Sequence, residues 1–272
     1  MALLEIRRKS LVNPESMYLH NYRKNVTSQL GEDGVIEKIF EIAGTPNKWC
    51  VEFGAWDGKH FSNTWSLLNI KGWRGVLIEG DRDRFVELEN NYNGSKNAVL
   101  LNTYIQVDGD NSLDAILQET DVPSDFDFLS IDVDGMDWYI WDSLAGYRPR
   151  VVIIEFNPTI PNDIYFVQDM DMSVNHGSSL LAMIDLAKRK GYELVATTEW
   201  NAFFVQEELF PLFGIQDNDI DSMHSVDRFE SRLFQLYDGT LVLGGCAHLV
   251  WKGIPIHQND VQILPVALRK YG

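Results

Sequence analysis

Short apolar runs alternate with amphipathic segments along most of the chain. Seven runs have the length of buried strands: WCVEFG (49–54), RGVLIEGD (74–81), AVLLNTYIQ (98–106), FDFLSIDVDG (126–135), RVVIIEFN (150–157), YELVATTEW (192–200) and NAFFVQEE (201–208). Between them, helical spacing predicts helices over 62–70, 82–93, 111–119, 136–145 and 178–190. Nearly continuous apolar strands separated by helices indicate a parallel sheet covered on both faces. The pattern therefore predicts a doubly wound α/β fold.

Some segments depart from this alternation. Only a short link separates 192–200 from 201–208, so these runs are expected to form a hairpin that adds one antiparallel strand to a mostly parallel seven-stranded sheet. Residues 31–44 predict a helix ahead of the first strand. Residues 158–177 predict a long loop, and loops of that length in compact domains are usually functional or disordered, so this segment is a candidate lid.

The whole chain, 1–272, is interpreted as one domain. Residues 1–46 form an N-terminal cap segment, 47–209 a cofactor-binding core, and 210–272 a C-terminal extension with a candidate strand pair in 232–253. No repeat or linker divides these parts.

Composition narrows the class of partner. The formal net charge of −17 repels nucleic acid and anionic membrane surfaces. Two distant cysteines, Cys50 and Cys246, indicate neither a disulfide framework nor a cysteine-based zinc site. The first residues lack the order of a secretory signal, and no run reaches membrane-spanning length. We therefore expect a soluble, cytoplasmic protein that binds neither nucleic acid nor membrane.

Acids and glycines follow the first two predicted strands, where open α/β sheets bind ligands. The first strand ends at Glu52 and runs into the turn Gly54-Ala55-Trp56-Asp57-Gly58. The second ends at Glu79-Gly80-Asp81, about twenty residues beyond the turn, where an acid can bind both hydroxyls of a ribose.

The charge of this turn argues against a diphosphate ligand. It lacks the middle glycine of GxGxxG, and Glu52 and Asp57 are expected to face the ligand. Two unit charges about 5 Å apart interact by roughly 3 kcal/mol at an effective dielectric of about 20. A cationic ligand without phosphate, such as S-adenosylmethionine, fits better, although an ordinary acidic turn would show the same pattern.

The stretches VEFGAWDGKHFSNT, GVLIEGD, FLSIDVDGMD and VVIIEFN resemble S-adenosylmethionine-dependent methyltransferases of the Rossmann-like class, especially the FkbM-like group, over residues 28–208. The resemblance implies that SQLGED (28–33) caps the cofactor, that Glu79 binds ribose, that Asp108 lies near adenine, and that Asp132 matches a fourth motif. Asn63 and Thr64 could reach the cofactor or cap a helix. The predicted cofactor-binding residues are Gln29, Glu52, Gly54, Ala55, Asp57, Gly58, Asn63, Thr64, Glu79, Gly80, Asp108 and Asp132.

Four oxygen-bearing side chains follow the fourth and fifth strands. Asp132 and Asp134 are two residues apart, as are Glu155 and Asn157, so each pair is expected to point one way. Such oxygens suit Mg²⁺ or Mn²⁺, in a layout similar in position to catechol-type metal-dependent O-methyltransferases. Alternatively, these acids bind the cofactor's amino group or hold loops. The candidate catalytic residues are Asp132, Asp134 and His176, which could act as a general base.

The sequence thus favours an S-adenosylmethionine-dependent O-methyltransferase. Its partner would be a small hydroxyl acceptor, which the resemblance suggests is polyhydroxylated or sugar-derived and belongs to surface-glycan or secondary-metabolite synthesis. An NAD-dependent oxidoreductase or sugar-nucleotide enzyme, and a non-catalytic cofactor-binding subunit, stay open as alternatives. The sequence does not indicate an oligomeric state.

Overall fold

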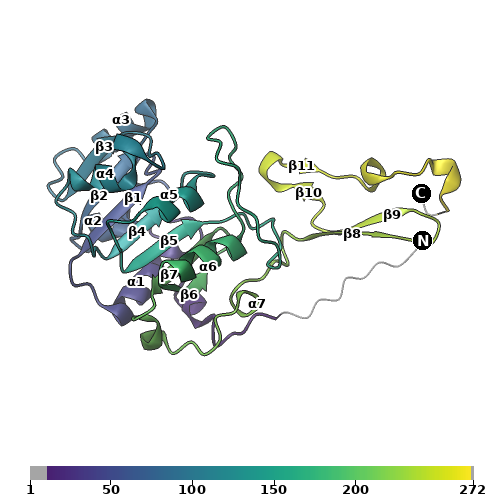
Figure 1. Cartoon of the computed structure of the whole chain (residues 1–272), viewed down its shortest axis with the longest axis horizontal. Helices are drawn as coiled ribbons and strands as arrows, with labels where there is room; N and C mark the ends of the chain where they lie inside the picture. Colours follow the sequence, from purple (N-terminus) through teal and green to yellow (C-terminus); the bar gives the residue numbers. More distant parts are fainter. Residues whose placement is uncertain (1–10, 271–272) are drawn as a thin grey trace.

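The computed structural model describes residues 11–270, so the first ten residues of the predicted cap segment lie outside the described part of the chain. A seven-stranded sheet of order β3-β2-β1-β4-β5-β7-β6 forms its centre (Figure 1). The strands are β1 (Trp49–Phe53), β2 (Arg74–Glu79), β3 (Ala98–Asn102), β4 (Phe128–Ile131), β5 (Val151–Glu155), β6 (Tyr192–Thr197) and β7 (Asn201–Gln206). Only β7 runs against its neighbours in this sheet of the described chain, which confirms the predicted fold and hairpin.

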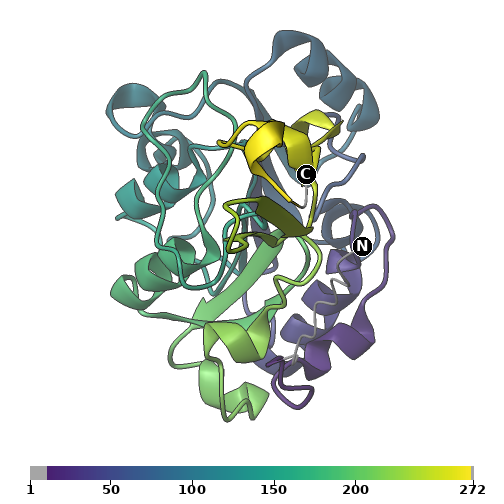
Figure 2. The ribbon, with the colours of Figure 1, turned by 90° about the vertical axis from the view of Figure 1, so that its right-hand side faces the viewer.

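Helices cover both faces of the sheet (Figure 2). They are α1 (Glu32–Ala43), α2 (Trp65–Asn69), α3 (Arg82–Asn91), α4 (Leu113–Gln118), α5 (Asp137–Ser143) and α6 (Leu180–Arg189). Helices α1 to α3 lie on one face and α4 to α6 on the other. The side chains of Asp81, Ser112 and Ser179 accept backbone N–H groups at the starts of α3, α4 and α6, so these helices begin where local capping chemistry places them. Among residues 11–270, no helix has the length and apolarity that crossing a membrane requires.

The strand order creates a crevice at one edge of the sheet. From β1 the chain moves outward through β2 to β3, then returns to β4 on the other side of β1 and continues to β5. The connections therefore diverge between β1 and β4, and a ligand can enter beyond the carboxyl ends of these strands.

The core packs against both faces of this sheet. All five residues of β1 are buried. On one face the Phe40 ring of α1 meets Phe128 of β4 edge-on at 5.8 Å between centroids. On the other face, the ring centroid of Trp141 in α5 lies 5.7 Å from that of Tyr192 and 5.4 Å from that of Phe204. Packing on both sides makes the sheet a rigid support for residues at its edge.

The distal part of the C-terminal extension projects away from the sheet (Figure 1). The extension begins against the core with the short helix α7 (Ile220–Met223), where Met223 is buried. The predicted strand pair then forms as the hairpin β8 (Ser231–Gln235) and β9 (Leu241–Gly245), followed by the smaller pair β10 (His248–Leu249) and β11 (Ile254–Pro255). All of β8 is exposed. Trp251 of the extension packs on Trp200, immediately before β7, at 5.0 Å between ring centroids. The extension is thus joined to the core near the start of β7.

Replacing Trp141 with Ala is expected to lower the free energy of unfolding by about 3–5 kcal/mol, because the indole is fully buried and leaves a large cavity. Urea denaturation followed by circular dichroism measures the loss. The matched control is Tyr237→Ala, where the ring is fully exposed and the expected change is within about 0.5 kcal/mol. Equal losses in the two variants would contradict this account of the core.

Candidate cofactor and metal site

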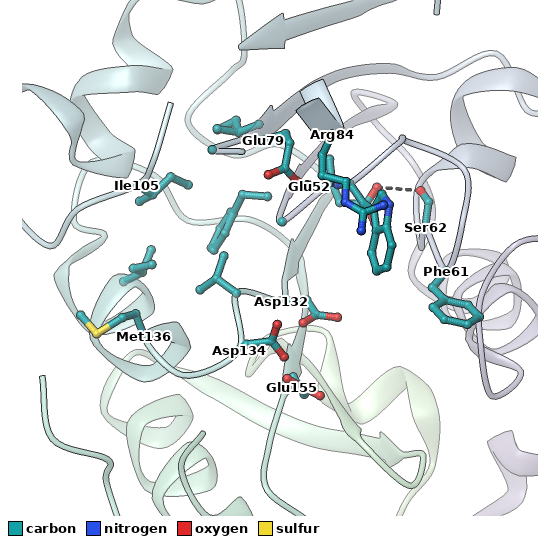
Figure 3. A pocket seen from close by; sticks show the side chains of 18 of the residues that line it. Glu52, Phe61, Ser62, Glu79, Arg84, Ile105, Asp132, Asp134, Met136 and Glu155 are labelled. Carbon is teal, nitrogen blue, oxygen red and sulfur yellow. Dashed lines mark hydrogen bonds between the residues drawn. The ribbon is translucent and has the colours of Figure 1, made fainter. Parts of the chain in front are cut away.

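A cavity of about 510 Å³ opens beyond the carboxyl ends of β1, β2, β4 and β5 (Figure 3). This volume is typical of small-molecule sites. Of the predicted cofactor and metal residues, Gln29, Glu52, Gly54, Ala55, Asn63, Glu79, Gly80, Asp132, Asp134 and Glu155 line it. The strand ends therefore bring these residues together as expected.

The glycine turn after β1 has two different sides. Gly54 has φ +71°, and a Cβ there would lie 1.7 Å from the backbone oxygen of Asp132, so the turn packs directly on the end of β4. Gly58 instead packs against Leu88 of α3, away from the cavity. The Asp57 carboxylate accepts the N–H groups of Lys59 and His60 and does not line the cavity. The prediction that Asp57 faces the ligand is therefore wrong: it closes its own turn.

Glu52 is buried, and its carboxylate accepts hydrogen bonds from the three residues that precede α2. Its Oε1 accepts the Asn63 N–H at 2.8 Å, and its Oε2 accepts the Ser62 and Thr64 hydroxyls, both at 2.7 Å. Burial raises the pKa of Glu52 above its usual value. Thr64 is fully buried in this arrangement and does not line the cavity, whereas Asn63 lines it. Thr64 therefore supports Glu52 rather than reaching a ligand.

Glu79 is held from two directions. Its Oε2 accepts the Trp56 N–H from the β1 turn at 2.7 Å, and its Oε1 accepts the Asp81 N–H at 2.7 Å. Each carboxylate oxygen has a second lone pair, so the side chain can still accept hydrogen bonds from a ligand in the cavity. Ribose binding by Glu79 stays a prediction that this placement at the cavity allows.

The segment SQLGED reaches the cavity through Gln29 and Glu32. Asp33 anchors it by accepting the backbone N–H groups of Val26, Thr27 and Ser28. Glu32 is only 1% exposed; its Oε2 accepts the Leu30 N–H, but its Oε1 is buried without a hydrogen-bond partner. A buried carboxylate oxygen without a partner is costly, so Glu32 is a site where a cationic group would be stabilised. Gln29 is the predicted cofactor-binding residue in this segment, and Glu32 was not predicted.

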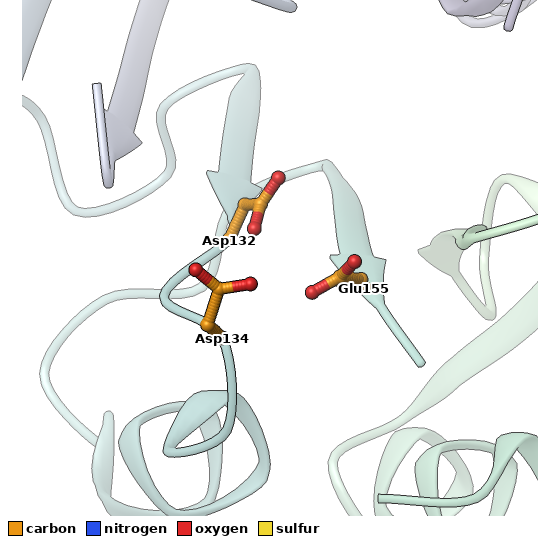
Figure 4. A group of neighbouring side chains, drawn as sticks. All are labelled: Asp132, Asp134 and Glu155. Atoms are coloured by element: carbon orange, nitrogen blue, oxygen red, sulfur yellow. The ribbon is translucent and has the colours of Figure 1, made fainter. Parts of the chain in front are cut away.

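Three carboxylates converge at the ends of β4 and β5 (Figure 4). Asp132, Asp134 and Glu155 each offer an oxygen within 4.8 Å of the others. Asp134 has the left-handed φ of +54°, which turns the chain back over the cluster. Asp137 holds this turn by accepting the N–H groups of Val133 and Gly135, so its own oxygens are engaged.

The cluster is electrostatically strained as three free acids. Asp132 is exposed to the cavity that it lines, and protein atoms surround its other sides. Burial, with repulsion from Asp137, Asp134 and Glu52, raises the pKa of Asp132 well above its usual value. Burial and repulsion from Asp132 likewise raise the pKa of Glu155. A proton or a cation must therefore reduce the negative charge here.

Asn157 lies outside this cluster. Its Oδ1 accepts the N–H and hydroxyl of Thr159, and its Nδ2 donates to the backbone oxygen of His176. The side chain therefore closes the base of the 158–177 loop and does not line the cavity. This contradicts its expected place among the metal ligands.

Two other predicted residues lie away from the cavity lining. The His176 side chain is exposed, and its backbone N–H donates to Gln168. Asp108 is exposed beyond β3, where Thr103, Tyr104 and Ile105 line the cavity instead. A general base from the predicted set therefore has to come from the carboxylate cluster.

The 158–177 loop supplies one wall. Gln168 is buried, and its side chain donates to the backbone oxygen of Val174 and accepts the N–H groups of His176 and Gly177. These bonds shape the inner part of the loop, and Met172, Val174 and Asn175 line the cavity. The loop predicted to be a lid thus lines the cavity, and hydrogen bonds within the loop hold its inner part in place.

An aromatic rim on the opposite side was largely missed from the sequence. The Arg84 guanidinium lies 4.0 Å from the centre of the Trp56 ring, and His60 stacks at 3.8 Å on Phe61. Trp56 and Phe61 adopt left-handed φ values of +51° and +58°, yet both stay exposed. Strained, exposed aromatic residues at a cavity are a feature of ligand-binding sites. Arg84 is on α3, and no sequence motif around it predicts that it contacts Trp56.

No family model and no curated protein matches this chain. Among solved structures, it matches the N-terminal domain of EvdMO1, solved with S-adenosylhomocysteine (SAH) and D-fucose, at 13% identity, over 64% of this chain and 80% of that one, with a TM-score of 0.40. A SAM-dependent methyltransferase from Aquifex aeolicus matches at 13% identity, over 62% and 86%, with a TM-score of 0.39. An O-methyltransferase family protein from Burkholderia thailandensis matches at 11% identity, over 63% and 55%, with a TM-score of 0.41. Proteins this different can share a fold without sharing an activity.

Asp132→Asn is expected to stabilise the protein in EDTA, because the neutral amide removes repulsion within the cluster. A raised folded-state pKa disfavours the ionised form, so the parent loses this stability as pH rises above the ordinary carboxyl range of about 4. The difference in Tm between variant and parent should therefore grow between pH 5 and 8 and reach about 2–4 °C. This shift corresponds to a gain of about 1 kcal/mol in the free energy of unfolding for a protein of this size. The gain is kept small because solvent in the cavity screens the repulsion.

Calorimetry across this pH range measures the difference. Asp121→Asn, at an exposed side chain beside Arg74, is the control and should show no such trend. A variant that is less stable than the parent at pH 8 would contradict the assigned repulsion.

Proposed function

We propose that this protein is an S-adenosylmethionine-dependent O-methyltransferase. One observation carries the proposal: the charge of the cavity. Its lining within residues 11–270 includes six carboxylates and one arginine, Arg84, which stacks on Trp56. The carboxylates are Glu32, Glu52, Glu79, Asp132, Asp134 and Glu155. A cavity of this charge favours a ligand with a sulfonium and an ammonium group and opposes one that carries phosphate.

The cavity offers a position for each part of this cofactor. Glu79, already oriented by two backbone N–H groups, would accept the ribose hydroxyls. The glycine turn at Gly54 and Ala55 would allow the backbone to approach the methionine part. The unpartnered oxygen of Glu32 would receive the ammonium group. Thr103 to Ile105, beyond β3, would border the adenine.

The chemical step would depend mainly on alignment. The methyl group of a sulfonium is already activated, so the protein has to hold the acceptor oxygen in line with it and remove the acceptor's proton. Asp134 is the candidate base, because its carboxylate faces the cavity from the turn after β4. Asp132 and Glu155 lie beside it and would orient the acceptor hydroxyl through hydrogen bonds.

The same three carboxylates would hold a divalent cation such as Mg²⁺ or Mn²⁺. Their oxygens fit the preference of these ions, and a bound cation would offset the repulsion between Asp132 and Glu155 that, with burial, raises the pKa of both. When bound, such an ion lowers the pKa of an acceptor hydroxyl.

We further propose a small polyhydroxylated or sugar-derived acceptor. The exposed rings of Trp56 and Phe61 at the rim suit stacking on the apolar face of a sugar, and the carboxylates suit its hydroxyls. Membership of the FkbM-like group, and a role in surface-glycan or secondary-metabolite synthesis, rest on the resemblance of the sequence motifs. A cytoplasmic location fits the two free cysteines, Cys50 and Cys246.

Thermal unfolding with S-adenosylmethionine, SAH and NAD⁺ tests the proposal. Each adenosyl ligand at a hundred times its dissociation constant should stabilise the protein by about 2.7 kcal/mol, and NAD⁺ should not, because its diphosphate meets the carboxylates. Stabilisation by NAD⁺ alone would favour an oxidoreductase. Binding of S-adenosylmethionine without SAH release on any of a panel of polyols and sugars would favour a non-catalytic subunit.

Glu79→Ala should weaken SAH binding by about 10- to 100-fold, because one or more hydrogen bonds to a charged group are lost, each worth about 1.5–3 kcal/mol. Isothermal titration calorimetry measures the affinity. The matched control is Asp121→Ala, which removes a carboxylate at the amino end of the sheet and should bind SAH like the parent. An unchanged affinity in Glu79→Ala would remove the ribose assignment.

A further inference from the structure

The side chain of Asn201 lies beside Glu155 of the carboxylate cluster. It was not among the site residues predicted from the sequence, because it begins a strand instead of ending one. Asn201 is the first residue of β7 and pairs directly with Glu155, the last residue of β5. Residues directly opposite each other in an antiparallel pair share one face of the sheet, with Cβ atoms about 4.5–5.5 Å apart. Asn201 also lines the cavity with Asp132 and Asp134. The side chain is therefore placed beside Glu155, in the cavity that Asp132 and Asp134 also line.

The amide oxygen of Asn201 has no partner. The residue is 8% exposed, and its Oδ1 is buried without a hydrogen bond. The backbone groups of Asn201 both bond to Thr198. The Thr198 hydroxyl accepts the Asn201 N–H, and the Thr198 N–H donates to the backbone carbonyl of Asn201. A buried amide oxygen without a donor loses its hydration and gains nothing in exchange. Rotation about χ2 exchanges the amide oxygen and nitrogen, so either can face the cavity.

Two other oxygen-bearing side chains near the cluster, Asp137 and Asn157, are engaged in hydrogen bonds of their own. Asp137 accepts two backbone N–H groups of the β4 turn. The Oδ1 of Asn157 accepts two hydrogen bonds from Thr159. Of these neighbours, Asn201 is the one whose oxygen is buried beside the acids and unused.

We infer that Asn201, rather than Asn157, is the fourth protein ligand of a divalent-cation site formed with Asp132, Asp134 and Glu155. The inference rests on the proposed function, because it completes the ion site of that proposal. Three carboxylates and an amide are a hard, all-oxygen set that suits Mg²⁺ or Mn²⁺ and not a thiolate- or imidazole-seeking ion. The amide adds a ligand without adding a fourth negative charge. An octahedral ion keeps two further positions, which an acceptor oxygen and a water can occupy.

Manganese binding without cofactor tests the inference. The free Mn²⁺ signal in electron paramagnetic resonance is titrated against the parent, Asn201→Ala, Asn201→Asp and Asn157→Ala. Asn201→Ala should bind Mn²⁺ at least about tenfold more weakly, as loss of a metal-site partner typically does. Asn201→Asp should bind Mn²⁺ more tightly than the parent, because a carboxylate replaces the neutral amide, and Asn157→Ala should match the parent.

The reverse pattern, with Asn157→Ala weakened and Asn201→Ala unchanged, would overturn the inference, and so would a parent that does not bind Mn²⁺. Thermal unfolding in EDTA checks that the variants fold. If Asn201→Ala does not fold, Asn201→Asp decides: its fourth carboxylate should give a larger Mn²⁺-dependent rise in Tm than the parent shows, and an equal rise would overturn the ligand role.

SAH affinity in metal-free buffer separates this inference from the proposed function. SAH binding with no Mn²⁺ binding overturns the ion site alone. Absence of SAH binding together with normal Mn²⁺ binding leaves the four ligands in place and removes the methyltransferase.

Discussion

Repulsion between carboxylates at one end of the sheet is the constraint on which this site depends. Asp132 and Glu155 follow two adjacent parallel strands, so a sheet packed on both faces holds them close together regardless of their charge. Their raised pKa values are the consequence. Protons or cations that reduce its charge would relieve this repulsion.

The acids of the cavity divide into two groups with different support. Glu52 and Glu79, on the side of β1 and β2, receive hydrogen bonds from neighbouring loops and are fixed in place by them. Asp132, Asp134 and Glu155, on the side of β4 and β5, lack an equivalent set of backbone donors among the hydrogen bonds of the described chain and face one another. The first group suits a ligand that is held in one orientation, and the second suits an ion or a proton that comes and goes.

Segments far from the strand ends complete the enclosure. The 158–177 loop contributes a wall because Gln168 binds its backbone from within, and the cap segment contributes Glu32 because Asp33 gathers three backbone N–H groups. The aromatic rim depends on left-handed backbone at Trp56 and Phe61, which points large rings outward where burial would otherwise favour them inside. The wall of the cavity is therefore completed by three parts of the chain that have no common sequence pattern.

The amino-acid sequence by itself determined the strands, the hairpin and the carboxylates Glu52, Glu79, Asp132, Asp134 and Glu155, because apolar periodicity is local and parallel strands end at a common edge. It could not determine the direction of Asp57 or Asn157, since each side chain is captured by hydrogen bonds within two or three residues that depend on the turn geometry. Asn201 needed the tertiary structure for another reason. Asn201 begins the antiparallel strand β7, and the amino end of β7 lies beside the carboxyl end of β5. Only the pairing of β5 with β7 therefore brings Asn201 to the site.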